Sequence, residues 1–149
     1  MREAKVVALN VQERHGVHPR TVSEMIARVG GGLVGDLHSE RQRRAVLVLD
    51  RAVVDELGLA AGDLREQITI DGIPNVSRLE PGTELRIGGV TLRVDGECEP
   101  CTHIGELNEQ ADVEAFRVAL GGRRGALCTV VAADRPIRVG DPVRVLART

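Results

Sequence analysis

Aromatic residues are nearly absent from this sequence: Phe116 is its only phenylalanine, and it has no tryptophan or tyrosine. The core must therefore be built from aliphatic side chains, and the supply of valine favours strands. Single-stranded nucleic acids are usually bound through a basic surface and stacking aromatic rings. The chain has 20 basic and 22 acidic residues, so nucleic acid is not expected as a partner.

Long hydrophobic runs are missing too. The apolar run at residues 6–9 is too short for the core of a signal peptide, and no stretch approaches the ~20 residues of a membrane span. Cysteine occurs three times, an odd number that excludes a complete set of intramolecular disulfides. A reduced, cytoplasmic protein without a membrane segment is predicted. Residues 1–149 fit one domain, and the oligomeric state stays open.

Short apolar stretches separated by glycine and proline predict a fold rich in strands. The expected strands cover residues 5–11, 45–49, 68–70, 85–87, 90–94, 126–132 and 142–146. Gly88-Gly89 predicts a tight hairpin between two of them. Helices are expected at 51–57, capped by Asp50, and within 104–120, where Asp112 caps 113–120; residues 21–29 fit either a helix or a strand. The pattern predicts a mainly β (α+β) fold, a β-barrel with a few short helices.

The Cys98-x-x-Cys101 spacing allows three interpretations. A thioredoxin-like redox pair requires a βαβ unit, which is not predicted, and Pro100 is expected to hinder a helix directly after it. A zinc site would use Cys98, Cys101 and His103, with Cys128 as a further ligand, although a second close-spaced ligand pair is missing. In the third interpretation only Cys101 is functional, and Cys98 and Cys128 are small apolar residues of the interior.

Two polar segments are candidates for anion binding. The glycine-dense loop 30–38 contains Asp36 and His38, and glycines allow the backbone N–H groups to approach an anionic ligand. Arg124 precedes a predicted strand, where a guanidinium can clamp a phosphate or carboxylate. Each segment equally fits a solvated turn. The arginines at 41, 43 and 44 are expected on a solvated face.

Taken in order, several segments resemble the MOSC domain, the C-terminal domain family of molybdenum-cofactor sulfurases, in its stand-alone bacterial type. They are LVGDLH (33–38), GDLREQITI (62–70), LEPG (79–82), IGG (87–89), PC (100–101), RG (124–125) and IRVGDPV (137–143). The resemblance implies a β-barrel that carries sulfur or binds a molybdenum cofactor. It also implies that Cys101 is the residue that accepts a persulfide or ligates molybdenum.

The same resemblance implies a set of cofactor-binding residues: Gly35, Asp36, His38, Gln67, Thr69, His103, Arg124 and Gly125. Expected partners are a sulfur donor protein or a partner oxidoreductase. Pyridoxal phosphate belongs to a separate domain of the family's sulfurase and is not expected in this chain. Whether the chain is an enzyme stays open between a sulfur transferase and a component of a molybdenum-dependent reductase.

Two acidic residues, Glu97 and Glu99, precede Cys101 and would raise the pKa of its thiol and repel an anionic cofactor. A non-catalytic module that binds an anionic ligand or cofactor is therefore an alternative function. The zinc site is the second alternative.

Overall fold

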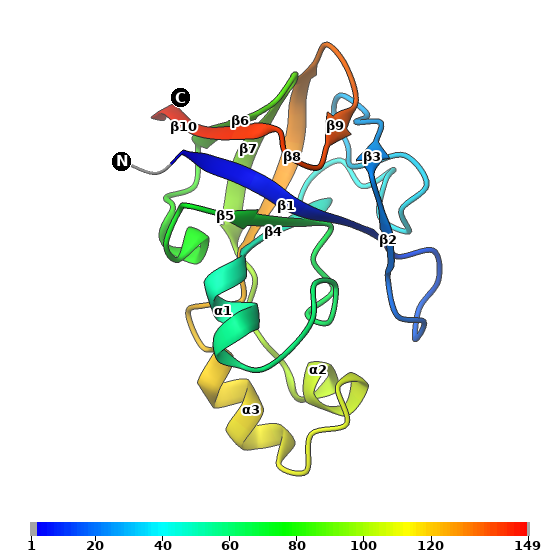
Figure 1. The fold of residues 1–149 in the computed structure, drawn as a ribbon, viewed down its shortest axis with the longest axis vertical. Coiled ribbons are helices and arrows are strands. Elements are labelled where there is room, and N and C mark those ends of the chain that lie inside the picture. The colour runs from blue at the N-terminus through cyan, green and yellow to red at the C-terminus, as the bar shows by residue number, and fades with distance from the viewer. Residues whose placement is uncertain (1–2, 149) are drawn as a thin grey trace.

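Seven strands close into a barrel in the computed structural model of the protein, which describes residues 3–148 (Figure 1). Pairing between the first and last strands, β1 and β10, closes the ring. The strand order is β10 (Pro142–Arg148), β6 (Thr83–Ile87), β7 (Val90–Glu97), β8 (Ala126–Ala133), β4 (Val46–Asp50), β5 (Ile68–Asp71) and β1 (Ala4–Val11). This architecture confirms the predicted mainly β barrel.

Residues 21–29, which fitted either helix or strand, contribute two short strands. β2 (Arg20–Val22) pairs with the end of β1, and β3 (Glu24–Met25) pairs with β9 (Ile137–Arg138) in a separate small sheet. The partners of β3 lie more than a hundred residues away, so local periodicity could not decide its conformation. The predicted hairpin at Gly88-Gly89 is confirmed by the antiparallel pairing of β6 with β7.

One βαβ unit is present, contrary to the expectation from the sequence. β4 and β5 are parallel neighbours, and α1 (Arg51–Glu56) lies between them in the chain. A parallel pair needs a crossover connection, and a helix usually supplies it. The Cys98-x-x-Cys101 segment lies outside this unit, because it follows β7. The chain therefore contains a βαβ unit that was not predicted, but the Cys98-x-x-Cys101 motif does not belong to it. A thioredoxin-like site at this motif is still not expected.

Three short helices gather at one end of the barrel: α1, α2 (Thr102–Leu107) and α3 (Val113–Leu120) (Figure 1). Asp112 caps α3, as predicted, by accepting a hydrogen bond from the Ala115 amide. Asp50 occupies the N-cap position of α1 but makes no capping hydrogen bond. Its carboxylate instead accepts from the amides of Asn75 and Val76, which fixes the 3-10 turn η1 (Val76–Arg78) against β4.

The helix α2 begins directly after Cys101, so the expectation that Pro100 hinders an immediate helix is wrong. A proline restricts the residue before it, here Glu99, and removes only its own N–H. Pro100 lies one position before the N-cap, where neither effect disturbs the helix. Cys101 itself is the N-cap residue, with an extended backbone.

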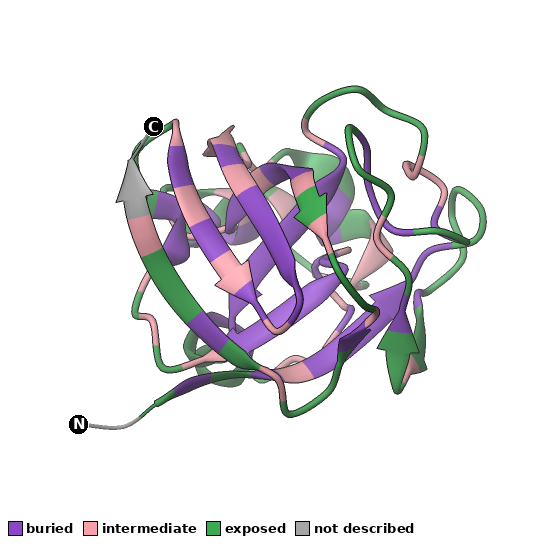
Figure 2. Cartoon of the chain, turned by 90° about the horizontal axis from the view of Figure 1, so that it is seen from above, coloured by how far each residue is buried: buried purple, intermediate pink, exposed green. Residues whose placement is uncertain are grey.

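Apolar side chains form two clusters. The larger cluster lies inside the barrel, and most of its residues come from β1 and β4 to β8. Figure 2 shows the buried residues along the strands that surround this interior. The smaller joins α1, α2 and α3 to the end of β4, and it contains Phe116. The single phenylalanine thus anchors the α2–α3 segment to the barrel and fixes the chain on either side of Cys101. None of the helices between residues 3 and 148 has the length and apolar character needed to cross a membrane.

Candidate functional site

Five strands of the barrel bring residues from their ends to one region. Gln12 follows β1, Ala45 precedes β4, Gln67 precedes β5, Cys98 follows β7, and Arg124 lies just before β8. Two hollows of about 180 and 200 Å³ open here and share the residues Gln12, His38, Arg65 and Arg124. We call the two together the groove.

Each half of the groove contains one cysteine. The inner half adds Arg41, Arg44, Ala45, Leu47, Gln67, Cys98 and Leu127 to the shared residues. The outer half adds His15, Gly16, Cys101, His103, Ile104 and Leu107. Within the described residues 3–148, no aspartate or glutamate lines either half.

Four arginines line the groove without carboxylate partners. Within residues 3–148, Arg41, Arg44, Arg65 and Arg124 form no ion pair, whereas Arg123, directly beside Arg124, pairs with Glu56 at 2.7 Å. Unpaired guanidinium groups around a hollow attract anions and can hold phosphate or carboxylate through paired hydrogen bonds. The groove is therefore a positive site on a chain whose formal net charge is −2.

Arg65 and Arg124 are the two arginines that line both halves of the groove. The Nε atom of each is buried and has no hydrogen-bond partner among the described residues. Arg65 donates through Nη1 to the carbonyl of Val17, and Arg124 donates through Nη2 to that of Leu64 at 3.4 Å. Burial, and after it the charge of Arg124, lowers the pKa of Arg65, while Asp63 raises it. Two cationic side chains that line the same groove and have unsatisfied donors suit an anionic ligand.

The backbone of Arg65 has φ +64°, in the left-handed region that residues other than glycine rarely adopt. Its amide donates to the carbonyl of Gly62 at 2.9 Å. Strained backbone of this kind persists only where the surroundings enforce it, and it clusters at ligand sites. The turn at 62–65 thus directs the Arg65 side chain toward the groove.

Asp36 and Gln67 build the wall of the groove. Asp36 is buried, and its carboxylate accepts from the amides of Gln12 and His38, both at 3.0 Å. It also accepts from Nε2 of Gln67 at 2.9 Å, and Oε1 of Gln67 accepts from the Leu47 amide. These bonds occupy the polar atoms of both side chains, so the pair positions His38. Gln67 lines the inner half, and Asp36 lies behind it.

His38 lines both halves of the groove. Burial and then the charge of Arg41 lower the pKa of His38 below 6.5, with a smaller lowering from His15, and Asp36 opposes them. His38 is therefore mostly neutral at pH 7, where one ring nitrogen can donate a hydrogen bond and the other can accept one. At neutral pH the positive charge of the groove comes from its arginines.

The three cysteines have different surroundings. Cys101 is exposed, Cys98 is half-buried, and Cys128 is fully buried in β8. Burial raises the pKa of Cys98, and Arg124 and Arg44 oppose this shift. Burial also raises the pKa of Cys128, so that residue is an inert part of the barrel interior, as the third interpretation predicts. Cys98, which the same interpretation treats as an apolar filler, instead lines the inner half of the groove.

Glu97 and Glu99 are exposed and do not line the groove. Glu99 makes only the smallest contribution to the raised pKa of Cys98. The two acids therefore face solvent, and the repulsion of an anionic ligand that their positions in the sequence suggest is weakened by water.

The remaining sequence candidates lie at different places. His103 lines the outer half beside Cys101 and approaches Glu106 at 3.5 Å. Thr69 is buried outside the groove, where its hydroxyl donates to Glu66. Gly35 is exposed and lines another hollow next to β2 and β3.

Gly125 packs closely against β4 and is hydrogen-bonded to the groove residue Cys98. Its φ is +96°, and a Cβ atom there would lie 2.4 Å from the carbonyl oxygen of Val48. Its amide donates to the Ser77 hydroxyl, and its carbonyl accepts from the Cys98 amide at 2.9 Å. Gly125 thus holds Cys98 in position by close backbone packing.

The three consecutive glycines 30–32 of the glycine-dense loop do not offer their amides to a ligand, contrary to the expectation from the sequence. Gly30 donates to the carbonyl of Val130, Gly31 to that of Arg28, and Gly32 to that of Ser39. The loop packs against β8, and its role is to carry the segment 36–44 to the groove.

No group of three or more His, Cys, Asp or Glu side chains in residues 3–148 is arranged to hold a metal ion. The zinc site proposed from Cys98, Cys101 and His103 therefore lacks its ligand set. The surroundings of Cys98 also disfavour a zinc ion, because the arginines of the groove repel a cation.

The sequence did not mark Arg65, Gln12 and His15 as site residues. The solvated face expected for the arginines at 41, 43 and 44 is confirmed for Arg41 and Arg43, which are exposed, whereas Arg44 is half-buried; Arg41 and Arg44 also line the groove. Arg65 lies inside the segment 62–70 that carries the family resemblance, and this was the one available signal for it. The direction of its side chain depends on the left-handed backbone, which residue types alone do not reveal.

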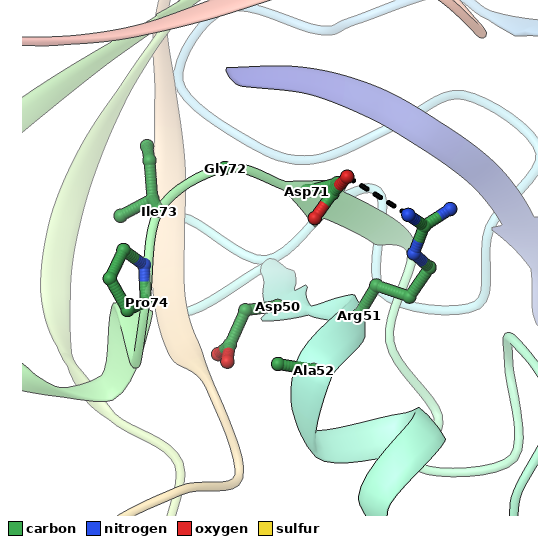
Figure 3. Close-up of a pocket in the computed structure, with 7 residues that line it drawn as sticks. All are labelled: Asp50, Arg51, Ala52, Asp71, Gly72, Ile73 and Pro74. Atoms are coloured by element: carbon green, nitrogen blue, oxygen red, sulfur yellow. Dashed lines mark hydrogen bonds and ion pairs between the residues drawn. The ribbon is translucent and has the colours of Figure 1, made fainter. Parts of the chain in front are cut away.

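A separate hollow of about 380 Å³ lies between α1 and the chain after β5 (Figure 3). Arg51 and Asp71 form an ion pair of 2.9 Å at one side of it, and Ile73 and Pro74 lie at the other side. Its lining includes no cysteine or histidine and none of the site residues predicted from the sequence.

Comparison with known proteins identifies one family. Residues 35–144 match the family model of the MOSC domain, and no curated protein matches the chain. The YuaD protein from Bacillus subtilis superposes with a TM-score of 0.82 at 21% identity, covering 97% of this chain and 96% of that one. YiiM from Escherichia coli gives 0.68 at 20% identity over 97% and 71%, and YiiM from Geobacillus stearothermophilus gives 0.74 at 16% over 97% and 75%. At these identities the solved structures establish a shared fold.

Proposed function

Because the chain belongs to the MOSC domain family, we propose that its groove binds an anionic cofactor or substrate beside Cys101. In this proposal Cys101 accepts a persulfide or ligates molybdenum. The observation that carries the proposal is the convergence of four arginines without carboxylate partners on a groove that also contains an exposed thiol.

The residues of the groove fit the molybdenum cofactor that the family implies. The orphaned Nε atoms of Arg65 and Arg124 are buried donors suited to a phosphate group. The exposed Cys101 is a soft thiolate donor of the kind that transition metals select. When bound, the cofactor would supply a redox-active molybdenum centre.

The protein's own residues would perform two tasks. Arg65 and Arg124 would orient the anion, and Asp36 with Gln67 would hold His38 at the groove, where its neutral ring can donate a hydrogen bond. Cys101 lines the outer half together with Arg65 and Arg124, so an anion held by these two arginines would lie in the same hollow as its thiol. His103 lines the outer half beside Cys101 and adds a ring that can hydrogen-bond a bound anion.

A matched pair of neighbouring arginines tests the anion site. We expect Arg124→Gln to weaken binding of inorganic phosphate, measured by titration calorimetry, by at least about tenfold, since a charge-assisted hydrogen bond contributes about 1.5–3 kcal/mol. Arg123→Gln removes the same charge one residue away, outside the groove, and is expected to leave the affinity within about twofold. Equal affinities for both variants and the unmodified protein would refute the anion site.

The non-catalytic binding module remains the second candidate. The solvent-facing Glu97 and Glu99 favour it only weakly. A module of this kind would lose phosphate binding with Arg124→Gln and would keep Cys101 unmodified after exposure to a sulfur donor. Persulfide mapping at Cys101 therefore separates the two functions.

A further inference from the structure

The half-buried Cys98 lines the inner half of the groove, where Arg41 and Arg44 add to the two arginines that both halves share. The exposed Cys101 lines the outer half. The backbone amide of Cys98 is fixed by the Gly125 carbonyl. The groove thus places one thiol within reach of an external donor and a second, less exposed thiol in the half that four arginines line.

We propose that Cys98 is a second sulfur-carrying residue, which receives a sulfur atom from a persulfide on Cys101 and holds it in the arginine-lined half of the groove. This inference rests on the proposed function, because Cys101 must first accept the persulfide. It also assigns a direction to the groove: sulfur enters at the exposed end and moves toward the bound anion.

The transfer is a thiol–persulfide exchange. The Sγ thiolate of Cys98 attacks the terminal sulfur of the Cys101 persulfide, a new S–S bond forms at Cys98, and the S–S bond at Cys101 breaks. Cys101 leaves as a thiolate and takes up the proton that Cys98 lost. One sulfur atom changes position, and neither an oxidant nor a reductant is required.

The chain between the two cysteines permits this contact. Three residues span at most about 10 Å even when fully extended, and a persulfide lengthens the Cys101 side chain by one S–S bond of about 2 Å. The two halves of the groove share four lining residues, so the path between the thiols follows one surface. The charge of Cys101 is also one of the causes that raise the pKa of Cys98.

The surroundings of Cys98 act differently on the two steps of its role. Burial makes the attacking thiolate less populated, and the charges of Arg124 and Arg44 offset part of this effect. Burial raises the pKa of Cys98, and a thiol with a raised pKa is a poor leaving group. Sulfur that reaches Cys98 is therefore retained there.

Persulfide mapping after exposure to glutathione persulfide tests this inference. Both cysteines lie in one tryptic peptide, residues 94–117, and fragmentation assigns the added sulfur to one or the other. In the unmodified sequence we expect the sulfur first on Cys101 and later on Cys98. In Cys101→Ala we expect Cys98 labelling to fall by at least about tenfold, because a half-buried thiol reacts slowly with external reagents.

Two further variants control the experiment. Cys98→Ser should leave the sulfur on Cys101, with a longer lifetime than in the unmodified sequence. Cys128→Ala should behave as the unmodified protein does, since Cys128 lies in the barrel interior. Circular dichroism of each variant confirms that it is folded.

The outcomes separate the two proposals. A persulfide that forms on Cys101 and never reaches Cys98 overturns the relay and leaves the proposed function standing. Labelling of Cys98 at an unchanged rate in Cys101→Ala also overturns it. A disulfide between the two cysteines would show attack on the inner sulfur, with loss of sulfide, and would contradict transfer. No persulfide on either cysteine refutes the sulfur-carrier function itself.

Discussion

Arg65 and Arg124 line the same groove with like charges, and each has a buried Nε atom that no described residue satisfies. Like charges in contact destabilise one another unless an opposite charge lies between them. The charge of Arg124 contributes to the lowered pKa of Arg65, after burial. An anion bound between the two side chains would satisfy both Nε donors and remove the repulsion.

Anion binding should strengthen as the pH falls. Burial and Arg41 lower the pKa of His38 below 6.5, so His38 gains a charge only in mildly acidic solution. A bound anion favours that charge, and by linkage the charge favours the anion. Sulfate keeps its two negative charges between pH 7.5 and about 5, so sulfate titrations over this range should show an affinity gain that is smaller in His38→Gln. An identical pH profile in His38→Gln would contradict this role.

The lowered pKa of His38 also makes the stability of the fold depend on pH. As the pH falls, this stability decreases, whereas the affinity for anions increases. Because the folded state lowers the pKa of His38 below its ordinary value of 6.5, the unfolded chain binds the proton first as the pH falls. The contribution of His38 to stability is therefore present above that value and decreases below it.

Asp36 should be critical for stability. Asp36→Ala leaves the amides of Gln12 and His38 and the Gln67 side chain without their acceptor, and we expect a loss of about 3 kcal/mol or more in urea unfolding. Asp134→Ala is the control, because this carboxylate forms an exposed ion pair with Arg86, and its loss should be below about 1 kcal/mol. Similar losses for both variants would argue against the buried network.

Much of the barrel was predictable, since its signals are local. The hairpin at Gly88-Gly89 and the cap at Asp112 depend on neighbouring residues alone, and the structure confirms both. β3 was not predictable, because it is fixed by pairing between Met25 and Ile137. The loop 30–45 likewise depends on distant contacts, such as that between the Gly30 amide and Val130.

The candidate site was predictable only where a motif marked it. Cys101 and Arg124 stood out in the sequence and both line the groove. Arg44 carried no such mark, and the C-x-x-C spacing that marked Cys98 did not reveal its place in the groove, which follows from how the ends of β4 and β7 meet. Asp36 was correctly singled out, but its contacts are with backbone and Gln67, so its part is to position its neighbours.

Glu66 should make stability depend on pH. It is buried, and burial raises its pKa above 4.5, while the Thr69 hydroxyl and nearby backbone amides oppose the shift. Its contribution is therefore fully present below pH 4.5 and is lost as the pH rises through the folded-state pKa. Urea unfolding from pH 4 to 8 should show this decline relative to Glu66→Gln, which has no carboxyl group to titrate. Parallel curves for the two proteins would contradict the prediction.

Gly125 and Gly122 form a matched pair of glycines with positive φ. A Cβ at Gly125 would collide with the Val48 carbonyl, whereas Gly122 faces open space. Gly125→Ala should destabilise the fold by about 2–6 kcal/mol, because backbone strain and overpacking each contribute about 1–3 kcal/mol. Gly122→Ala carries only the backbone strain and should lose about 1–2 kcal/mol. Equal losses in thermal unfolding would show that the close approach is unimportant.

The proposed role of Cys101 can be tested by measuring molybdenum and persulfide sulfur in protein purified from a host that makes the molybdenum cofactor. Elemental analysis and intact-mass spectrometry would compare the unmodified protein with Cys101→Ala and, as control, Cys128→Ala. We predict molybdenum or persulfide sulfur in the unmodified protein and in Cys128→Ala, and loss of both in Cys101→Ala. Equal contents in Cys101→Ala and the unmodified protein would contradict the central claim that Cys101 acts at the groove.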